Sequence, residues 1–226
     1  MADLGTKITC YFAQFAGVPA GAPDVPAGST QWVIAQNTLT GYFYYYDLLI
    51  SAWVQLKMAS DPLAVLGQVI VPAGAGVATV TFSSIPATYS QLRFSIVARC
   101  TGSGSPYALL MRMNGDSGGS NYPQQLINGV GGTVTATGAT AGYITIGNIP
   151  GAATVTPDGG YVTGVLPGYA RTDWYKLLFA DQSKTIYPPV NPVTGIWTST
   201  AAITSLTFYV ASQNIAPASI FTLWGE

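Results

Sequence analysis

The sequence of 226 residues contains no histidine and only one glutamate, Glu226. Charged residues make up 8% of the chain, against roughly 25% in ordinary soluble domains. Hydroxyl nucleophiles usually need a histidine as base, and glycoside hydrolysis needs two carboxylates that flank the scissile bond. Because the chain has no histidine and its aspartates are scattered singly, the sequence predicts a protein that is not an enzyme.

The chain also lacks any excess of charge, since 8 basic and 9 acidic residues give a net charge of -1. Nucleic-acid binding needs a basic patch that neutralises phosphates, and none is present. The chain has no run of 18 apolar residues, the length that a membrane-spanning helix needs, and residues 1–7 lack the pattern of a signal peptide. The sequence therefore predicts neither nucleic-acid binding nor membrane insertion, and no export signal.

Cysteine is scarce as well, with only Cys10 and Cys100 in the chain. Two cysteines in a chain of this length do not form a disulfide scaffold. Both lie in apolar runs, which is typical of buried free thiols, and a Cys10–Cys100 disulfide is the alternative. Neither cysteine belongs to a set of zinc ligands, and we expect no cofactor.

Glycine, proline and tyrosine are plentiful, with 26, 15 and 14 residues. Short runs rich in valine, threonine and aromatic residues alternate with turn residues, which is typical of an all-β sandwich, barrel or jelly roll. A surface of serine, threonine, asparagine and glutamine suits packing against copies of the same chain or against other subunits. Expected strands of the larger part are 68–71, 77–82, 92–98, 108–113, 133–135, 143–146, 161–165, 174–179, 203–210 and 220–224, with one turn of helix near 123–126.

Residues 1–60 form a separate small β-rich unit in this prediction. It contains a Pro/Gly-rich arm at 17–28 and an aromatic hairpin at 41–56. Successive strand side chains face opposite ways, so one face of the aromatic run must meet a neighbouring subunit, a ligand or solvent. We expect Tyr42, Tyr44, Tyr46 and Trp53 to contact another subunit or a particle.

Residues 115–119, Gly-Asp-Ser-Gly-Gly, copy the nucleophile segment of trypsin-like proteases. Without a histidine to accept its proton, Ser117 is not a nucleophile, and the segment reads as a turn. Asp116 and Asp158 are likewise expected in turns. A calcium site in the oxygen-rich loop 114–121 is the alternative.

Tyr187, Pro188 and Pro189 belong to a proline-rich segment that predicts a stiff, extended loop. The loop either bridges two strands or projects as an exposed contact arm.

The last residues alternate as a strand does, with Phe221 and Leu223 on one face and Thr222 and Trp224 on the other. We expect Phe221 and Leu223 to fill the core, and Trp224 and Gly225 to close the edge of the sandwich.

Four motifs occur in order along residues 66–226. They are Phe-Ser-Ser-Ile-Pro-Ala-Thr-Tyr-Ser-Gln-Leu at 82–92, Asn-Gly-Asp at 114–116 followed by Ser-Asn-Tyr at 120–122, Trp-Thr-Ser-Thr-Ala-Ala-Ile-Thr-Ser-Leu at 197–206, and Phe-Thr-Leu-Trp-Gly at 221–225. This series resembles a family of tailed-bacteriophage virion proteins, in which tyrosine is commoner than tryptophan at position 224. The motifs carry no catalytic residues.

The resemblance implies a jelly-roll β-sandwich at 61–226, displayed outward. The aromatic hairpin and the Pro/Gly-rich arm lead us to expect that the unit at 1–60 attaches it to the particle. The resemblance also implies a non-enzymatic virion structural protein, a surface-exposed fibre-type accessory protein that contacts host surface glycans. A capsid decoration protein that stabilises the head, and a carbohydrate-binding module, are the alternatives. Expected partners are copies of itself in a homotrimer and other virion proteins. The expected location is the virion surface, after assembly in the host cytoplasm and release by lysis.

Overall fold

The computed structural model describes residues 63–104, 106–130, 132–152, 158–184 and 190–226, and the backbone of the strands within 10–15, 32–37, 43–47 and 52–56. The chain divides into two compact units, Met1–Asp61 and Pro62–Glu226. Each unit is described below by itself. The described residues contain strands and turns and no helix, so the fold is all-β.

The first unit contains a four-stranded sheet in the order β1-β2-β3-β4. β1 and β2 run parallel, whereas β3 and β4 form an antiparallel pair in which Tyr46 lies opposite Trp53. The predicted aromatic hairpin is thereby confirmed as a pair of strands. The strands are β1 (Cys10–Phe15), β2 (Trp32–Asn37), β3 (Phe43–Asp47) and β4 (Ala52–Leu56).

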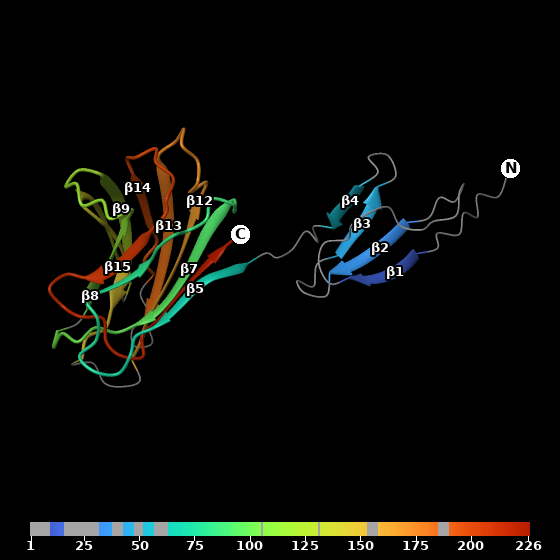
Figure 1. Ribbon diagram of the computed structural model, residues 1–226. Coiled ribbons are helices and arrows are strands. Elements are labelled where there is room, and N and C mark those ends of the chain that lie inside the picture. Colours follow the sequence, from blue (N-terminus) through green and yellow to red (C-terminus); the bar gives the residue numbers. More distant parts are fainter. Residues whose placement is uncertain are drawn as a thin grey trace. The chain divides into compact units, whose positions relative to one another are not determined.

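The second unit consists of two antiparallel sheets that pack face to face as a β-sandwich (Figure 1). The larger sheet has eight strands in the order β10-β9-β14-β13-β12-β7-β16-β5. The predicted jelly-roll connectivity stays a prediction. The strands of this sheet are β5 (Ala64–Ile70), β7 (Gln91–Ala98), β9 (Tyr122–Val130), β10 (Thr133–Ala141), β12 (Gly160–Pro167), β13 (Lys176–Lys184), β14 (Val193–Trp197) and β16 (Ile220–Gly225).

The smaller sheet has four strands in the order β11-β8-β15-β6. Its strands are β6 (Thr79–Phe82), β8 (Tyr107–Met113), β11 (Ile144–Ile149) and β15 (Leu206–Val210). A bulge between Thr145 and Gly147 interrupts the pairing of β11 with β8. Because β10 lies at the far end of the longer sheet, nearly all of its residues are exposed on both faces.

The core lies between the two sheets and follows from strand alternation. In β7 and β12 every second residue is buried and the residues between them face outward. Phe208 of β15 packs in edge-on or tilted geometry against Phe82, Phe94 and Phe221, with ring centroids 5.4–6.2 Å apart. Such a buried ring contributes about 3–5 kcal/mol, judged by the usual cost of its truncation to alanine.

The position of β16 corrects one prediction. Phe221 and Leu223 are fully buried in the core, as expected. β16 is nevertheless an interior strand between β5 and β7, so Trp224 and Gly225 do not close an edge. Beyond the strand, the Arg93 Nε lies 2.7 Å from Glu226 Oε2.

The predicted turn of helix near residues 123–126 is wrong, because this segment lies within β9. Sequence reasoning missed β9 and β14 as strands. Gln124 shows why β9 forms despite its polar residues. Its buried amide donates from Nε2 to the Tyr143 oxygen at 3.0 Å and accepts from Thr145 N at 2.7 Å, so the amide is satisfied inside the sandwich.

Candidate interaction surface

The aromatic residues predicted as contacts belong to the first unit. Tyr44 and Tyr46 lie on β3, where their strand partners are Gln55 and Trp53 of β4. Tyr42 lies outside the described residues. The strand pairing brings Tyr46 and Trp53 together across the hairpin, and their role as contacts stays a prediction.

The predicted contact loop of Tyr187, Pro188 and Pro189 also lies outside the described residues. The described chain resumes at Val190, which forms an isolated antiparallel bridge with Gly129 of β9.

The protease-like segment at 115–119 is a tight structural turn centred on Asp116. Its Oδ1 accepts hydrogen bonds from Gly118 N at 2.8 Å and Asn121 Nδ2 at 3.1 Å. Its Oδ2 accepts from Trp197 Nε1 at 2.7 Å and Asn121 Nδ2 at 2.9 Å. Both oxygens of the Asp116 carboxylate, which a calcium ion would need as a ligand, therefore already accept hydrogen bonds from N–H donors.

The electrostatics of Asp116 agree with this role. The indole N–H of Trp197, followed by the Gly118 N–H, lowers the pKa of the Asp116 carboxyl below its ordinary value, because both donors favour the ionised form. A general acid or base would need a pKa shifted towards neutrality instead. Ser117 is exposed, and its neighbour Asp116 is held as an anion by structural donors.

Asn114 joins two of the sequence motifs. It takes a left-handed conformation with φ of 52°, and its Oδ1 accepts hydrogen bonds from Thr204 N at 2.8 Å and Ser205 N at 3.0 Å. Its Nδ2 donates to the Ala202 oxygen at 2.8 Å. Together with the Asp116–Trp197 bond, these contacts fasten the Asn-Gly-Asp segment to the Trp-to-Leu segment at 197–206.

A second junction joins the first and last motifs. The hydroxyl of buried Tyr169 donates to the Pro86 oxygen and accepts from Tyr89 N at 3.4 Å. The Tyr89 ring lies over Gly225, where an added Cβ would be 2.4 Å from the ring carbons. Only glycine fits beneath this ring, so the closing glycine of the last motif is explained by packing.

Lys176 is buried at the start of β13 and serves a similar structural purpose. Its Nζ donates to the Trp174 oxygen at 2.8 Å and to the Thr200 oxygen at 3.0 Å. Burial lowers the pKa of the Lys176 ammonium. The side chain therefore ties the loop before β13 to the loop before β15.

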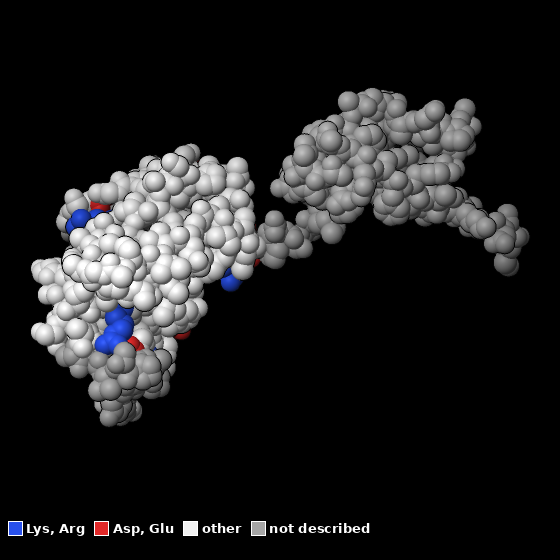
Figure 2. Space-filling view, turned by 60° about the horizontal axis from the view of Figure 1, so that its bottom comes forward, with Lys and Arg blue, Asp and Glu red and all other residues white. Residues whose placement is uncertain are grey.

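The outward face of the larger sheet carries two rows rich in apolar residues, and the row between them is polar, with Gln68, Thr222, Ser95, Thr163 and Asp181. The strand register aligns two rows of outward-facing residues across β5, β16, β7, β12 and β13. The apolar members of one row are Ile70, Ile220, Val97 and Tyr161, and those of the other row are Val65, Trp224, Val165 and Phe179. Phe179 is 50% exposed and Tyr161 is 46% exposed. Figure 2 shows only scattered charges on the visible face of the described part of this unit. Exposed apolar side chains grouped in rows on a face with few charges suit contact with a partner.

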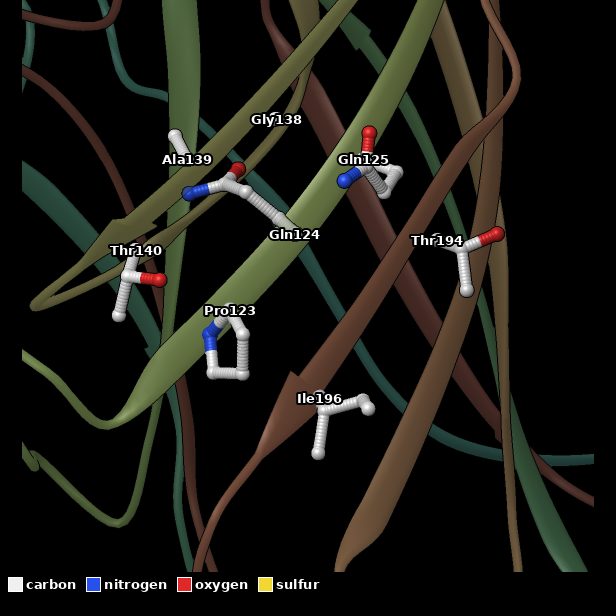
Figure 3. Close-up of a pocket in the computed structure, with 8 residues that line it drawn as sticks. All are labelled: Pro123, Gln124, Gln125, Gly138, Ala139, Thr140, Thr194 and Ile196. Carbon is white, nitrogen blue, oxygen red and sulfur yellow. The ribbon is translucent and has the colours of Figure 1, made fainter.

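The outward face continues into a shallow groove of about 480 Å³ over β9, β10 and β14 (Figure 3). The side chains of Gln125 and Thr194 stand on neighbouring strands there, and Gln125 folds over Gly138, where an added Cβ would be 2.7 Å from its Nε2. The groove is lined by Pro123, Gln124, Gln125, Gly138, Ala139, Thr140, Thr194 and Ile196. No charged residue is among them, so the groove offers packing and hydrogen bonding rather than acid–base chemistry.

Two further properties concern the described part of the chain. Cys100 is a buried free thiol. Within the described ranges, no group of three or more histidine, cysteine, aspartate or glutamate residues could hold a metal ion, and no helix is long and apolar enough to cross a membrane.

Comparisons of this chain with protein-family models, with curated proteins and with solved structures found no match.

Proposed function

We propose that the protein is a non-enzymatic structural component of a tailed-phage virion, a fibre-type accessory protein exposed at the particle surface. The observation that carries the proposal is the meeting of the sequence motifs in space. Asn114 and Asp116 bind the 197–206 segment, and Tyr89 covers Gly225. The residues behind the resemblance are therefore those that hold the sandwich together, as expected when a family shares an architecture rather than a reaction.

The outward face of the larger sheet supports association with other subunits. Its rows of apolar residues carry few charges, and the net charge of the whole chain is -1. Such a chain has little electrostatic repulsion to overcome when copies associate. Copies of itself, in the homotrimer expected from the sequence, and other virion proteins are the proposed partners of this face.

The two units have different proposed roles. Met1–Asp61 attaches the protein to the particle, and Pro62–Glu226 is displayed outward. The test is a phage that encodes this chain with residues 1–60 deleted. Purified particles are analysed by mass spectrometry against particles with the full-length chain. We expect the truncated protein to remain in the lysate and to be absent from particles.

Normal incorporation of the truncated chain would contradict the attachment role. Absence of the full-length chain from purified particles would contradict the virion assignment itself. A cryo-EM map of the particle separates the two placements, because a fibre-type protein projects from the tail or head, whereas a capsid decoration protein lies on the shell.

Glycan binding is a second candidate function, favoured by two neighbouring aromatic side chains. Trp174 is 65% exposed and Tyr175 is 58% exposed, and the Arg171 guanidinium lies 4.9 Å from the Trp174 ring centroid. Tryptophan and tyrosine combine an apolar ring with a polar group, which suits contact with a sugar as well as with a protein partner. The test is a glycan array probed with the full chain and with Trp174→Ala. Binding by the full chain that is lost in the variant supports this function, and an array without any binding contradicts it.

A further inference from the structure

The edge strands of the two sheets of the second unit differ in how they are protected from pairing with another chain. β5 and β11 each carry a break in register, and β6 has only four residues. Bulges and short length are the usual devices that prevent edge-to-edge association. β10 has nine residues, and its register with β9 is unbroken from Thr133 to Ala141. It also contains no charged residue and no proline.

The hydrogen bonds of β9 decide which main-chain groups of β10 point away from the sheet. Ile127 N donates to the Pro192 oxygen at 3.1 Å, and Gly129 N donates to the Val190 oxygen at 2.9 Å. These residues therefore face away from β10. In an antiparallel sheet successive residues bond to opposite neighbours, so the residues of even number in β9 bond to β10.

Their partners in β10 are the residues of odd number, because Leu126 lies opposite Thr137 and Val130 lies opposite Thr133. The N–H and C=O groups of the even-numbered residues then point outward from the edge. These residues are Val134, Ala136, Gly138 and Thr140.

We propose that β10 pairs in antiparallel register with β10 of a second copy of this chain, with Thr137 opposite Thr137 about a two-fold axis. In this register Val134 lies opposite Thr140, and Ala136 lies opposite Gly138. Every outward-pointing residue meets another outward-pointing residue, which gives about eight main-chain hydrogen bonds across the axis. Shifting one strand by two residues would lose part of this match.

The side chains of β10 permit the close approach that the register requires. All are threonine, alanine, glycine or valine, and Val134 is 71% exposed. Opposed strands pass about 4.5–5.5 Å apart, so long or charged side chains at this edge would oppose pairing. The connected β9 is also without charge, so two copies meet without repulsion between like charges.

A two-fold contact of this kind is isologous and closes with two copies. It differs from the contact within a homotrimer, which must be heterologous. A second copy fits β10 better through its own β10 than through its β5, because the break in β5 interrupts the row of hydrogen bonds. The proposed pairing is inferred from the edge strand alone, so it does not depend on whether the protein is a virion component.

The first test is the molar mass of the full chain in solution, measured by light scattering after size exclusion. Thr137→Lys places two ammonium groups opposite each other at the axis. Thr79→Lys makes the same change at an exposed residue of β6, on the other sheet. We expect the original chain and Thr79→Lys to form assemblies with an even number of copies. Thr137→Lys should form assemblies of half that molar mass. A monomer or a simple trimer in the original chain, or an unchanged mass in Thr137→Lys, would overturn the pairing.

The second test reads the register. Thr137→Cys places two thiols opposite each other in a non-hydrogen-bonded pair, with Cα atoms about 4.5 Å apart, within reach of a disulfide. In Thr135→Cys the two thiols belong to residues offset by about 13 Å along the strands, which is too far. We expect an oxidised covalent dimer of Thr137→Cys and none of Thr135→Cys or of the original chain. Equal cross-linking of the two variants, or none in either, would refute the register.

Discussion

Replacing Asp116 by asparagine tests whether the turn at 115–119 is a structural junction. The change keeps the shape of the side chain but turns one carboxylate oxygen into an N–H donor. Trp197 Nε1 and Gly118 N donate to different oxygens of Asp116, so the new amide group must face one of these donors. The donor that the amide group faces loses its acceptor, and where that donor is the indole of Trp197, which is 3% exposed, water cannot replace the bond.

The expected loss is about 2–4 kcal/mol in the free energy of unfolding. A buried donor left without an acceptor costs about 1–3 kcal/mol, and the loss of bonds to a charged acceptor adds to this. Such a loss is a large fraction of the about 5–15 kcal/mol of a typical domain. The measurement is unfolding of the full chain in guanidinium, followed by tryptophan fluorescence at pH 7.

Asp173→Asn is the matched control. Asp173 is exposed and paired with Arg171, and exposed ion pairs contribute little to stability. We expect this variant to unfold at nearly the same guanidinium concentration as the original chain. If Asp116→Asn were no more destabilising than Asp173→Asn, the structural role of Asp116 would be refuted.

The dependence of the unfolding free energy on pH is a second test of the role of Asp116. The pKa of Asp116 is lowered in the folded protein from 3.8, so the ionised carboxylate stabilises the fold above that pH. This contribution falls as the pH drops from about 3.8 through the lowered pKa. The difference in unfolding free energy between the original chain and Asp116→Asn should therefore shrink in this acidic range. A difference that stays constant down to the acid limit of folding would contradict the mechanism.

Three other predictions follow from buried contacts. Gly225→Ala should destabilise the protein by about 1–3 kcal/mol, because its Cβ would overlap the Tyr89 ring. Gly119→Ala has open space around the added carbon, so it should change stability by less than about 0.5 kcal/mol in the same denaturation experiment. Lys176→Met should cost about 2 kcal/mol, because two carbonyl oxygens lose a shared donor; an effect equal to that of Lys184→Met would contradict this. Burial raises the pKa of the Cys100 thiol, so we expect it to resist iodoacetamide in the native protein and to react after unfolding, as measured by peptide mass spectrometry.

The fold class was predictable because the strands of this chain alternate strongly. β7 and β16 follow the expected pattern, with Phe94 and Phe221 inside. β9 and β14 were missed for physical reasons. The Gln-Gln pair of β9 carries no apolar alternation, and the burial of Gln124 depends on hydrogen bonds to Tyr143 and Thr145, about 20 residues away in the sequence. In β14, Gly195 removes an apolar residue from the pattern because Ile144 fills its place, 2.7 Å from an added Cβ.

The interaction surface was less predictable than the fold. Threonine and alanine alternate along β10 in the sequence, but alternation alone does not tell which strand has a neighbour on only one side. The edge is revealed by strand order, and the outward N–H groups are revealed by the bonds of Ile127 and Gly129. The contacts between motifs were equally hidden, because Asn114 and Thr204 are 90 residues apart in the sequence.

The interior position of β16 has a consequence for synthesis of the chain. β16 lies between β5 and β7, so these two strands leave the ribosome before the strand with which both pair has been synthesised, more than a hundred residues later. The larger sheet can close only after residues 220–225 have emerged. Pairing over such long sequence separations is slow and leaves strand edges open in the meantime. Nascent chains are therefore expected to gain protease resistance abruptly, when the last strand enters the sheet.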